Sequence, residues 1–243
     1  MHDSPFRGHK GLTRRTALVH GLVAAWLIFA ARRQAWALSL SDLTESDAAG
    51  GIKAALERGV GFAVESLGQD GGFLNNDRVR ITLPGHLDQA AGALRMFGQG
   101  AKVDELVNAM NHAAEQAVPV GKSLLIKAVH TMSVSDAKGI LTGGDGSVTR
   151  FFADKTRQPL TEQFLPIVTK ATEHVGLADK YNAVASRGVG IGLVGSGDAN
   201  IQQYVTGKTI DGVYLLIGDE EKKIRQDPIG TGSTLLSKVF GAH

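Results

Sequence analysis

The sequence predicts an all-α protein: a single compact bundle of several helices with one short extended segment near residues 78–83. Two observations carry this prediction. Apolar residues recur at spacings of three and four along most of the chain, which is the period of an amphipathic helix. Only 6% of the residues are aromatic. The apolar remainder is rich in small and aliphatic side chains, which suits close-packed helices better than a β-sandwich.

The first helices follow from their apolar stripes and their end signals. One helix carries a stripe of small and apolar residues and ends near Gly68. The clearest amphipathic helix covers residues 103–117. Pro119 is expected to begin the next helix, because proline suits the first helical turn. Ser133 and Asp136 match a Ser-x-x-acid cap, which predicts a short helix after them.

The second half of the chain continues in the same way. Ser147 is expected to cap a helix, and Pro159 to restart it. Residues 187–197 are rich in glycine and apolar residues, so we expect a tight loop there. The longest predicted helix runs from a cap at Asp198 to about Gln226, and a last short helix covers residues 233–240.

The extended segment is predicted from strict alternation. Apolar and polar residues alternate before Pro84, and a period of two is typical of a half-buried strand. The apolar positions are Val79, Ile81 and Leu83, and the polar ones are Arg78, Arg80 and Thr82. No good partner strand is visible elsewhere, so an edge strand and a strap across the helices both remain open.

Residues 1–37 have the three-part pattern of an export signal. Arg14 and Arg15 precede an apolar run, and Ala35 and Ala37 stand at the two small positions that a signal peptidase reads. The run spans residues 16–31, which is shorter than the roughly 20 residues of a membrane-spanning helix. We therefore expect a cleaved signal and no stable transmembrane anchor after cleavage.

The expected domains are the signal, residues 1–37, and one helical domain, residues 38–243, in the periplasm of a Gram-negative bacterium. The arginine pair favours the twin-arginine route, with the general secretory route as the alternative. The whole chain has 26 basic and 24 acidic residues. Six basic residues and one acidic residue lie in the signal. The remaining domain therefore has 20 basic and 23 acidic residues, a formal charge of −3. That charge gives no indication of nucleic-acid binding.

The loop at residues 69–76 offers one candidate recognition site. Phe73 is apolar within a polar stretch, beside the amides of Asn75 and Asn76. The alternative is that Phe73 enters the core while the asparagines stabilise turns.

Other candidate recognition residues are charged. Asp136 follows a cap signal, and Asp145 lies in a glycine-rich turn. Lys208 and Asp211 are three residues apart on the long helix, where we expect a structural ion pair. None of these matches a catalytic motif, so no catalytic residue and no cofactor is predicted.

A metal site is not predicted either. The sequence contains no cysteine and no His-Glu-x-x-His motif. His112 and Glu115 stand at i and i+3 on the amphipathic helix. Di-iron bundles need two such pairs and two further glutamates, so a surface pair is expected.

Several short motifs resemble the bacterial domain of unknown function 4197 family. They occur in the family's order from about Leu38 to Gly241, nearly the whole mature chain. They are Gly72-Phe73-Leu74-Asn75-Asn76, Met132-Ser133-Val134-Ser135-Asp136-Ala137, Gly139-Ile140-Leu141, Gly143-Gly144-Asp145, Phe164-Leu165-Pro166-Ile167-Val168, Tyr204-Val205-Thr206 and Glu220-Glu221-Lys222-Lys223-Ile224-Arg225. The resemblance implies an exported helical protein and assigns no catalytic residue, cofactor or substrate.

Three functional hypotheses follow. The first is a non-enzymatic binding or envelope-associated protein, whose partner is a lipid or an envelope protein held between glycine- and alanine-rich helices. The second is a hydrolase that uses carboxylates such as Asp136, Asp145, Asp211 or Glu221. The third is a structural subunit of an envelope assembly.

Overall fold

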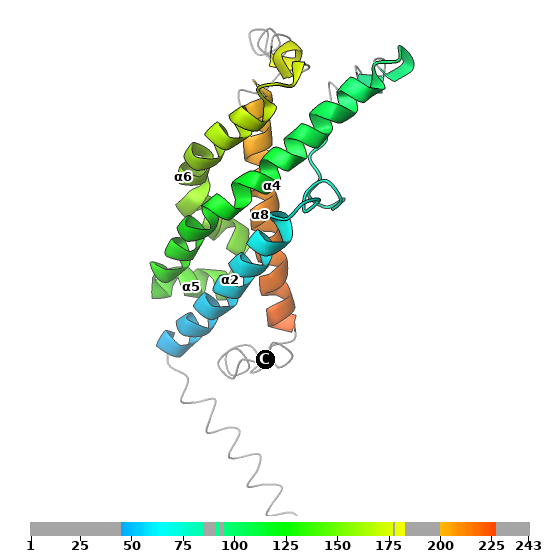
Figure 1. Ribbon diagram of the computed structural model, residues 1–243. Helices are drawn as coiled ribbons and strands as arrows, with labels where there is room; N and C mark the ends of the chain where they lie inside the picture. The colour runs from blue at the N-terminus through cyan, green and yellow to red at the C-terminus, as the bar shows by residue number, and fades with distance from the viewer. Residues whose placement is uncertain (1–44, 85–90, 93–94, 177, 183–199, 227–243) are drawn as a thin grey trace, which may run out of the picture. The chain divides into compact units, whose positions relative to one another are not determined.

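The computed structural model describes residues 45–84, 91–92, 95–176, 178–182 and 200–226. The helices with defined bounds in this part of the chain are α2 (Glu45–Leu67), α4 (Gly100–His130), α5 (Val134–Thr142), α6 (Ser147–Thr172) and α8 (Ile201–Gln226) (Figure 1), and further helical residues lie at 91–92, 95–96 and 178–182. The same residues contain no strand, which confirms the predicted all-α class. The export-signal segment, the predicted loop 187–197 and the predicted helix 233–240 lie outside the described residues.

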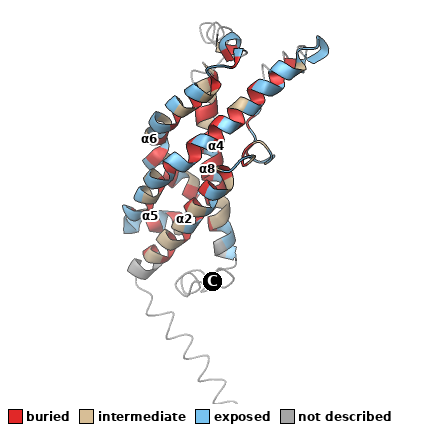
Figure 2. Cartoon of the chain, in the orientation of Figure 1, coloured by how far each residue is buried: buried red, intermediate tan, exposed pale blue. Residues whose placement is uncertain are grey.

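Helices α4 and α8 are the centre of the bundle. They contact each other, and α2 and α6 each pack against both of them (Figure 1). The short α5 contacts α2 and α6. Each long helix carries a stripe of buried residues (Figure 2). Burial of these stripes is the main source of stability in such a bundle, because no helix can cover its apolar face alone.

Helix α4 corrects one sequence prediction. It continues through Pro119, where we expected one helix to end and another to begin. Proline lacks an N–H and therefore leaves the carbonyl of Glu115 without its usual helical donor. Packing accommodates the ring: a Cβ added at Gly68 would lie 2.8 Å from Pro119 Cγ. The glycine next to α2 thus leaves room for the proline of α4.

Helix α6 corrects a second prediction. It begins at Ser147 and runs through both Pro159 and Pro166, whereas a restart was expected at Pro159. Ser147 is the first helical residue and does not cap the helix, because its hydroxyl donates a hydrogen bond to the Ile140 carbonyl at 3.0 Å. Apolar burial on the α4 and α8 side, as at Phe152, Leu160 and Phe164, holds the helix together across its prolines.

Helix α5 begins as predicted. Ser133 Oγ accepts a hydrogen bond from the Asp136 N–H at 3.0 Å, and the Asp136 carboxylate accepts one from the Ser133 N–H at 3.0 Å. This reciprocal capping box satisfies two backbone donors at the helix start.

The segment at residues 78–83 is a strap and not a strand. Val79, Ile81 and Leu83 are buried, while the residues between them are exposed, so the predicted alternation is confirmed. The strap is held by α4: Asn111 accepts from the Ile81 N–H at 2.8 Å and donates to the Ile81 carbonyl at 2.9 Å. A side-chain amide therefore takes the place of a partner strand.

Within the part of the chain that the structure describes, no helix combines the length and apolar character needed to cross a membrane.

Candidate functional site

The candidate site is centred on Glu115, a buried carboxylate in the middle of α4. Only 4% of its side chain is exposed. One oxygen, Oε1, accepts hydrogen bonds from the backbone N–H groups of Phe73 and Leu74 at 3.0 and 3.1 Å. The other, Oε2, lies 2.9 Å from His112 Nδ1. A buried carboxyl group is costly unless its oxygens have hydrogen-bond partners, and both oxygens of Glu115 have them.

The loop that supplies these two N–H groups has a fixed backbone. Gly71 adopts a φ of +79°, in the left-handed region that favours glycine. The Gly72 N–H donates to the Gln69 carbonyl at 2.9 Å, and the Asn75 N–H donates to the Gly71 carbonyl at 2.9 Å. The turn places Asp70 beside α4, while the following residues are tied to Glu115.

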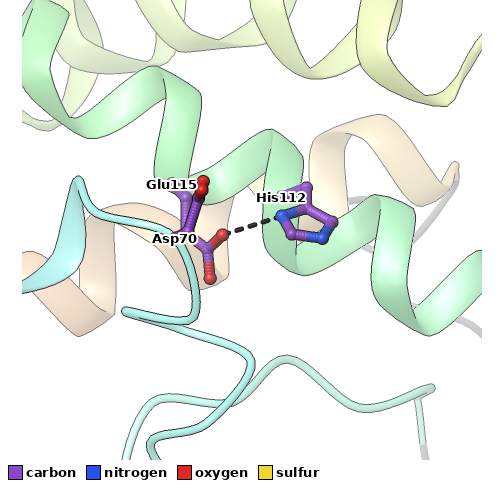
Figure 3. A group of neighbouring side chains, drawn as sticks. All are labelled: Asp70, His112 and Glu115. Atoms are coloured by element: carbon purple, nitrogen blue, oxygen red, sulfur yellow. Dashed lines mark hydrogen bonds and ion pairs between the residues drawn. The ribbon is translucent and has the colours of Figure 1, made fainter.

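Asp70, His112 and Glu115 bring their side chains together (Figure 3). One possible ligand atom from each lies within 4.8 Å of the others. Asp70 comes from the loop after α2, and the other two residues come from successive turns of α4. Asp70 and His112 are exposed and Glu115 is buried, so the cluster opens to solvent on one side and rests on the core on the other.

Glu115 is a residue of the candidate site whose burial the sequence reasoning missed. The sequence predicts a pair of His112 and Glu115 at the surface. The two side chains do pair, and His112 is 50% exposed, but Glu115 is buried. A usable signal was present: Glu115 stands between Ala114 and Ala117 in the apolar stripe that predicted the helix. A single acid inside such a stripe needs buried partners, which here come from the loop.

His112 also lines a groove between α4 and α6, which we call the α4–α6 groove. The groove has a volume of about 690 Å³. Its lining residues are Ala109, His112, Gln116, Pro166, Ile167, Lys170 and Ala171. Aliphatic side chains and proline form most of its surface. No carboxylate is among the lining residues, so the charge of Lys170 is not neutralised within the groove.

The predicted loop site divides into buried and exposed parts. Phe73 is fully buried, and a Cβ added at Gly212 of α8 would lie 2.9 Å from its Cε1 atom. The ring therefore packs into the core, in agreement with the alternative interpretation. Asn76 Oδ1 accepts from the Arg78 N–H at 3.2 Å, a turn-stabilising contact, whereas Asn75 is exposed.

Asp136 and Asp145 lie at the two ends of α5 and have separate partners. Asp136 belongs to the capping box, and the pKa of its carboxyl lies below the usual value, first because of the Ser133 N–H and then because of the Ser133 hydroxyl. Asp145 is 87% exposed and pairs with Lys222 at 3.1 Å. A hydrolytic carboxylate pair is not formed by these two residues.

Lys208 and Asp211 do not form the expected ion pair. Asp211 accepts a hydrogen bond from Arg157 of α6 at 2.7 Å. Lys208 Nζ instead lies 5.7 Å from the centre of the Tyr204 ring. Both residues line a second groove, of about 370 Å³, between the strap and α8. The helical spacing of three placed the two residues on one face but did not determine their partners.

The family model described as "Protein of unknown function (DUF4197)" matches residues 42–241. The chain belongs to the DUF4197 family. This confirms the resemblance, and the matched range contains the Asp70, His112 and Glu115 cluster and the α4–α6 groove. No curated protein and no solved structure matches the chain. For this DUF4197 protein, any function must therefore be argued from the site itself.

Proposed function

We propose that this protein is exported to the periplasm and binds an anionic amphiphile in the α4–α6 groove without transforming it. The amphiphile has one acidic head group and an apolar body, as a fatty acid or a lysophospholipid does. The observation that carries the proposal is the groove itself, which joins an apolar surface to a lysine and has no acid among its lining residues.

The apolar part of the groove supplies the binding energy. Ala109, Ile167 and Ala171 are partly buried residues that pack against the core, and Pro166 adds an exposed ring. Covering such surface is worth roughly 25 cal/mol per Å². The groove is about 690 Å³ in volume, within the roughly 300–1,000 Å³ that small-molecule sites occupy.

The polar part of the groove selects the head group. Lys170 supplies a cation, and Gln116 can donate from its side-chain amide. His112 contacts the buried Glu115 through Nδ1, so Nε2 remains for another contact. A carboxylate or phosphate suits these donors, whereas a second cation would be repelled by Lys170.

The export part of the proposal rests on residues 1–37 and on their three-part signal pattern. Binding without catalysis is supported by the contacts of the aspartates considered for hydrolysis. In the described part of the chain, Asp136, Asp145 and Asp211 each have a different cationic partner. Glu115, which contacts the groove residue His112, uses both oxygens to hold the protein's own groups.

Binding is tested with protein recovered from the periplasmic fraction after expression of the full chain. We expect native mass spectrometry to detect an amphiphile that survives purification, and palmitate to bind in a calorimetric titration. Reversing the charge with Lys170→Glu should weaken palmitate binding about tenfold or more, equivalent to roughly 1.4 kcal/mol. Hexadecanol, which has the same chain without the acid, should bind both proteins alike.

Lys102→Glu is the matched control, because Lys102 is an exposed lysine of α4 that does not line the groove. It should leave palmitate binding unchanged. Equal binding by the Lys170 and Lys102 variants, or no binding by the unaltered protein, would reject the groove as an amphiphile site.

Export is tested separately by replacing Arg14 and Arg15 with lysine and following the chain in cell fractions. Retention in the cytoplasm supports the twin-arginine route, because that machinery requires the arginine pair. Export of the variant supports the general secretory route. Retention of the unaltered chain in the cytoplasm contradicts the periplasmic assignment.

A further inference from the structure

The cluster of Asp70, His112 and Glu115 combines one imidazole with two carboxylates. These are the ligand types of zinc sites that keep an open position, which use three protein ligands and a fourth position for water. The chain contains no cysteine, so nitrogen and oxygen donors are the set available to such a metal. A soft, thiolate-preferring ion is therefore excluded at this cluster.

The distances are close to those of a metal site. With zinc–ligand bonds of about 2.1 Å, ligand atoms around a tetrahedral ion lie roughly 3.4 Å apart. The separation of His112 Nδ1 and Glu115 Oε2 is 2.9 Å, and the three possible ligand atoms lie within 4.8 Å of one another. To reach that geometry, the distance between His112 Nδ1 and Glu115 Oε2 must increase by about 0.5 Å. The longest separation between ligand atoms of the cluster must decrease by at most about 1.4 Å.

The side chains that must adjust are the ones that can. Asp70 and His112 are exposed, so their torsion angles can change without disturbing the core. Glu115 need not move, because two backbone N–H groups already hold Oε1 and direct Oε2 towards His112. A carboxylate held by further hydrogen bonds is the usual support of a protein metal site.

We propose that Asp70, His112 and Glu115 bind a divalent transition-metal ion of the zinc class. The ion takes the place of the proton shared by His112 Nδ1 and Glu115 Oε2, which is released or moves to Nε2. The fourth position is left for water or for an acidic group of a ligand. The metal connects the loop after α2 to α4, and its binding does not depend on the amphiphile proposed above.

A second histidine–glutamate pair in the same protein provides a control for the proposed metal site. His130 Nε2 lies 3.0 Å from Glu57 Oε1, with side chains 61% and 42% exposed. Within the described residues this pair belongs to no group of three metal-binding side chains. It therefore reproduces the imidazole–carboxylate contact without the third ligand and without the buried anchor.

The test is titration of the exported, metal-free protein with Zn²⁺ by calorimetry. We expect one equivalent of Zn²⁺ to bind at this cluster. Asp70→Asn and His112→Gln should each weaken that equivalent at least tenfold, whereas His130→Gln should not. Both altered side chains of the cluster are exposed, so these variants are expected to fold. Hydrogen exchange checks the location: Zn²⁺ should slow exchange of the Phe73 and Leu74 amides in the unaltered protein only.

The outcomes are distinct. The proposal is overturned if the unaltered protein does not bind Zn²⁺. It is also overturned if His130→Gln weakens Zn²⁺ binding as much as His112→Gln does. Unchanged Zn²⁺ binding in Asp70→Asn also overturns it, because two ligands would then suffice. Lys170→Glu separates this proposal from the previous one: it should weaken palmitate binding and leave Zn²⁺ binding intact.

Discussion

Helix α4 carries two histidine–glutamate contacts of nearly equal length and very different surroundings. His112 and Glu115 are 2.9 Å apart, and His130 and Glu57 are 3.0 Å apart. Glu115 is 4% exposed and also accepts two backbone N–H groups, whereas Glu57 is 42% exposed. The comparison shows that the length of an ion pair does not indicate its importance. What matters is which other groups depend on the carboxylate.

The physical reason is the solvent. At the surface, water replaces a lost partner, and exposed pairs are worth about 0.2–1 kcal/mol. In the interior no water is available, so removing the carboxylate leaves other polar groups unsatisfied. Glu115 is therefore both a charge partner and the acceptor that closes the loop onto α4.

The largest expected effect comes from removing the two carboxylates in turn. Glu115→Ala leaves the Phe73 and Leu74 N–H groups without an acceptor, at about 1–3 kcal/mol each. We expect the free energy of unfolding to fall by about 2–5 kcal/mol, measured by urea denaturation. Glu57→Ala should cost less than about 1 kcal/mol.

Glu115→Gln refines this first prediction, since the amide oxygen can still accept both N–H groups. It should recover part of the stability lost in the alanine variant. Similar losses in the alanine variants at positions 115 and 57 would show that the buried anchor has no special role.

The second expected effect concerns Asn111, the other buried polar side chain of α4 that holds an irregular segment. Asn111→Ala removes both hydrogen bonds to Ile81 and leaves a buried N–H and carbonyl unpaired. A loss of about 2–3 kcal/mol in unfolding free energy is expected. Asn108→Ala, at an exposed position, should change stability by less than about 0.5 kcal/mol; a comparable loss there would contradict the role of Asn111.

A third effect tests a carboxylate of intermediate exposure, Asp136. Asp136→Ala should cost about 1 kcal/mol at neutral pH, because it removes one half of the capping box. The pKa of Asp136 is lowered by Ser133, so its contribution is present above the unfolded pKa of about 3.9 and is lost as the pH falls through the folded value.

The measurement for Asp136 is urea denaturation of both proteins at several pH values. The difference between them should shrink below about pH 4. Asp145→Ala is the control, as this residue is an exposed acid at the other end of α5. A difference for Asp136→Ala that grows in acid would have the wrong sign.

The smallest expected loss of stability comes from replacing His112 or His130. His112→Gln should cost roughly 0.5–1 kcal/mol, because Glu115 loses one partner and keeps its two backbone donors. His130→Gln should be close to neutral, at less than about 0.5 kcal/mol. Thermal unfolding of the two variants side by side measures the difference, and a larger loss at His130 would reverse the comparison.

The helical period was sufficient to predict the fold class and most helices. Ile52, Leu56 and Val60 are all fully buried, as their spacing predicts. Helix boundaries at Pro119 and Pro159 were wrong, since the local cost of proline is outweighed by packing against other helices. Gly68 makes room for Pro119, but it lies 51 positions earlier in the sequence, so no local pattern reveals the contact.

The candidate site was less accessible to sequence reasoning. The capping role of Asp136 is local and was predicted correctly. The backbone N–H partners of Glu115 and Asn111 in the loop and the strap are 30 to 42 positions away in sequence, and a backbone N–H leaves no trace in the identity of its residue. Phe73 was assigned correctly by one of two interpretations, because a phenylalanine in a polar loop is consistent with either burial or recognition.

The contact between Phe73 and Gly212 has a consequence for how this sequence can diverge. The ring occupies the space that a side chain at position 212 would need, with a Cβ there only 2.9 Å from Cε1. In related chains, a residue larger than glycine at position 212 should accompany a smaller residue at position 73. The two positions, 139 apart in sequence, should therefore change together, and an alignment of the family in which they vary independently would contradict this packing.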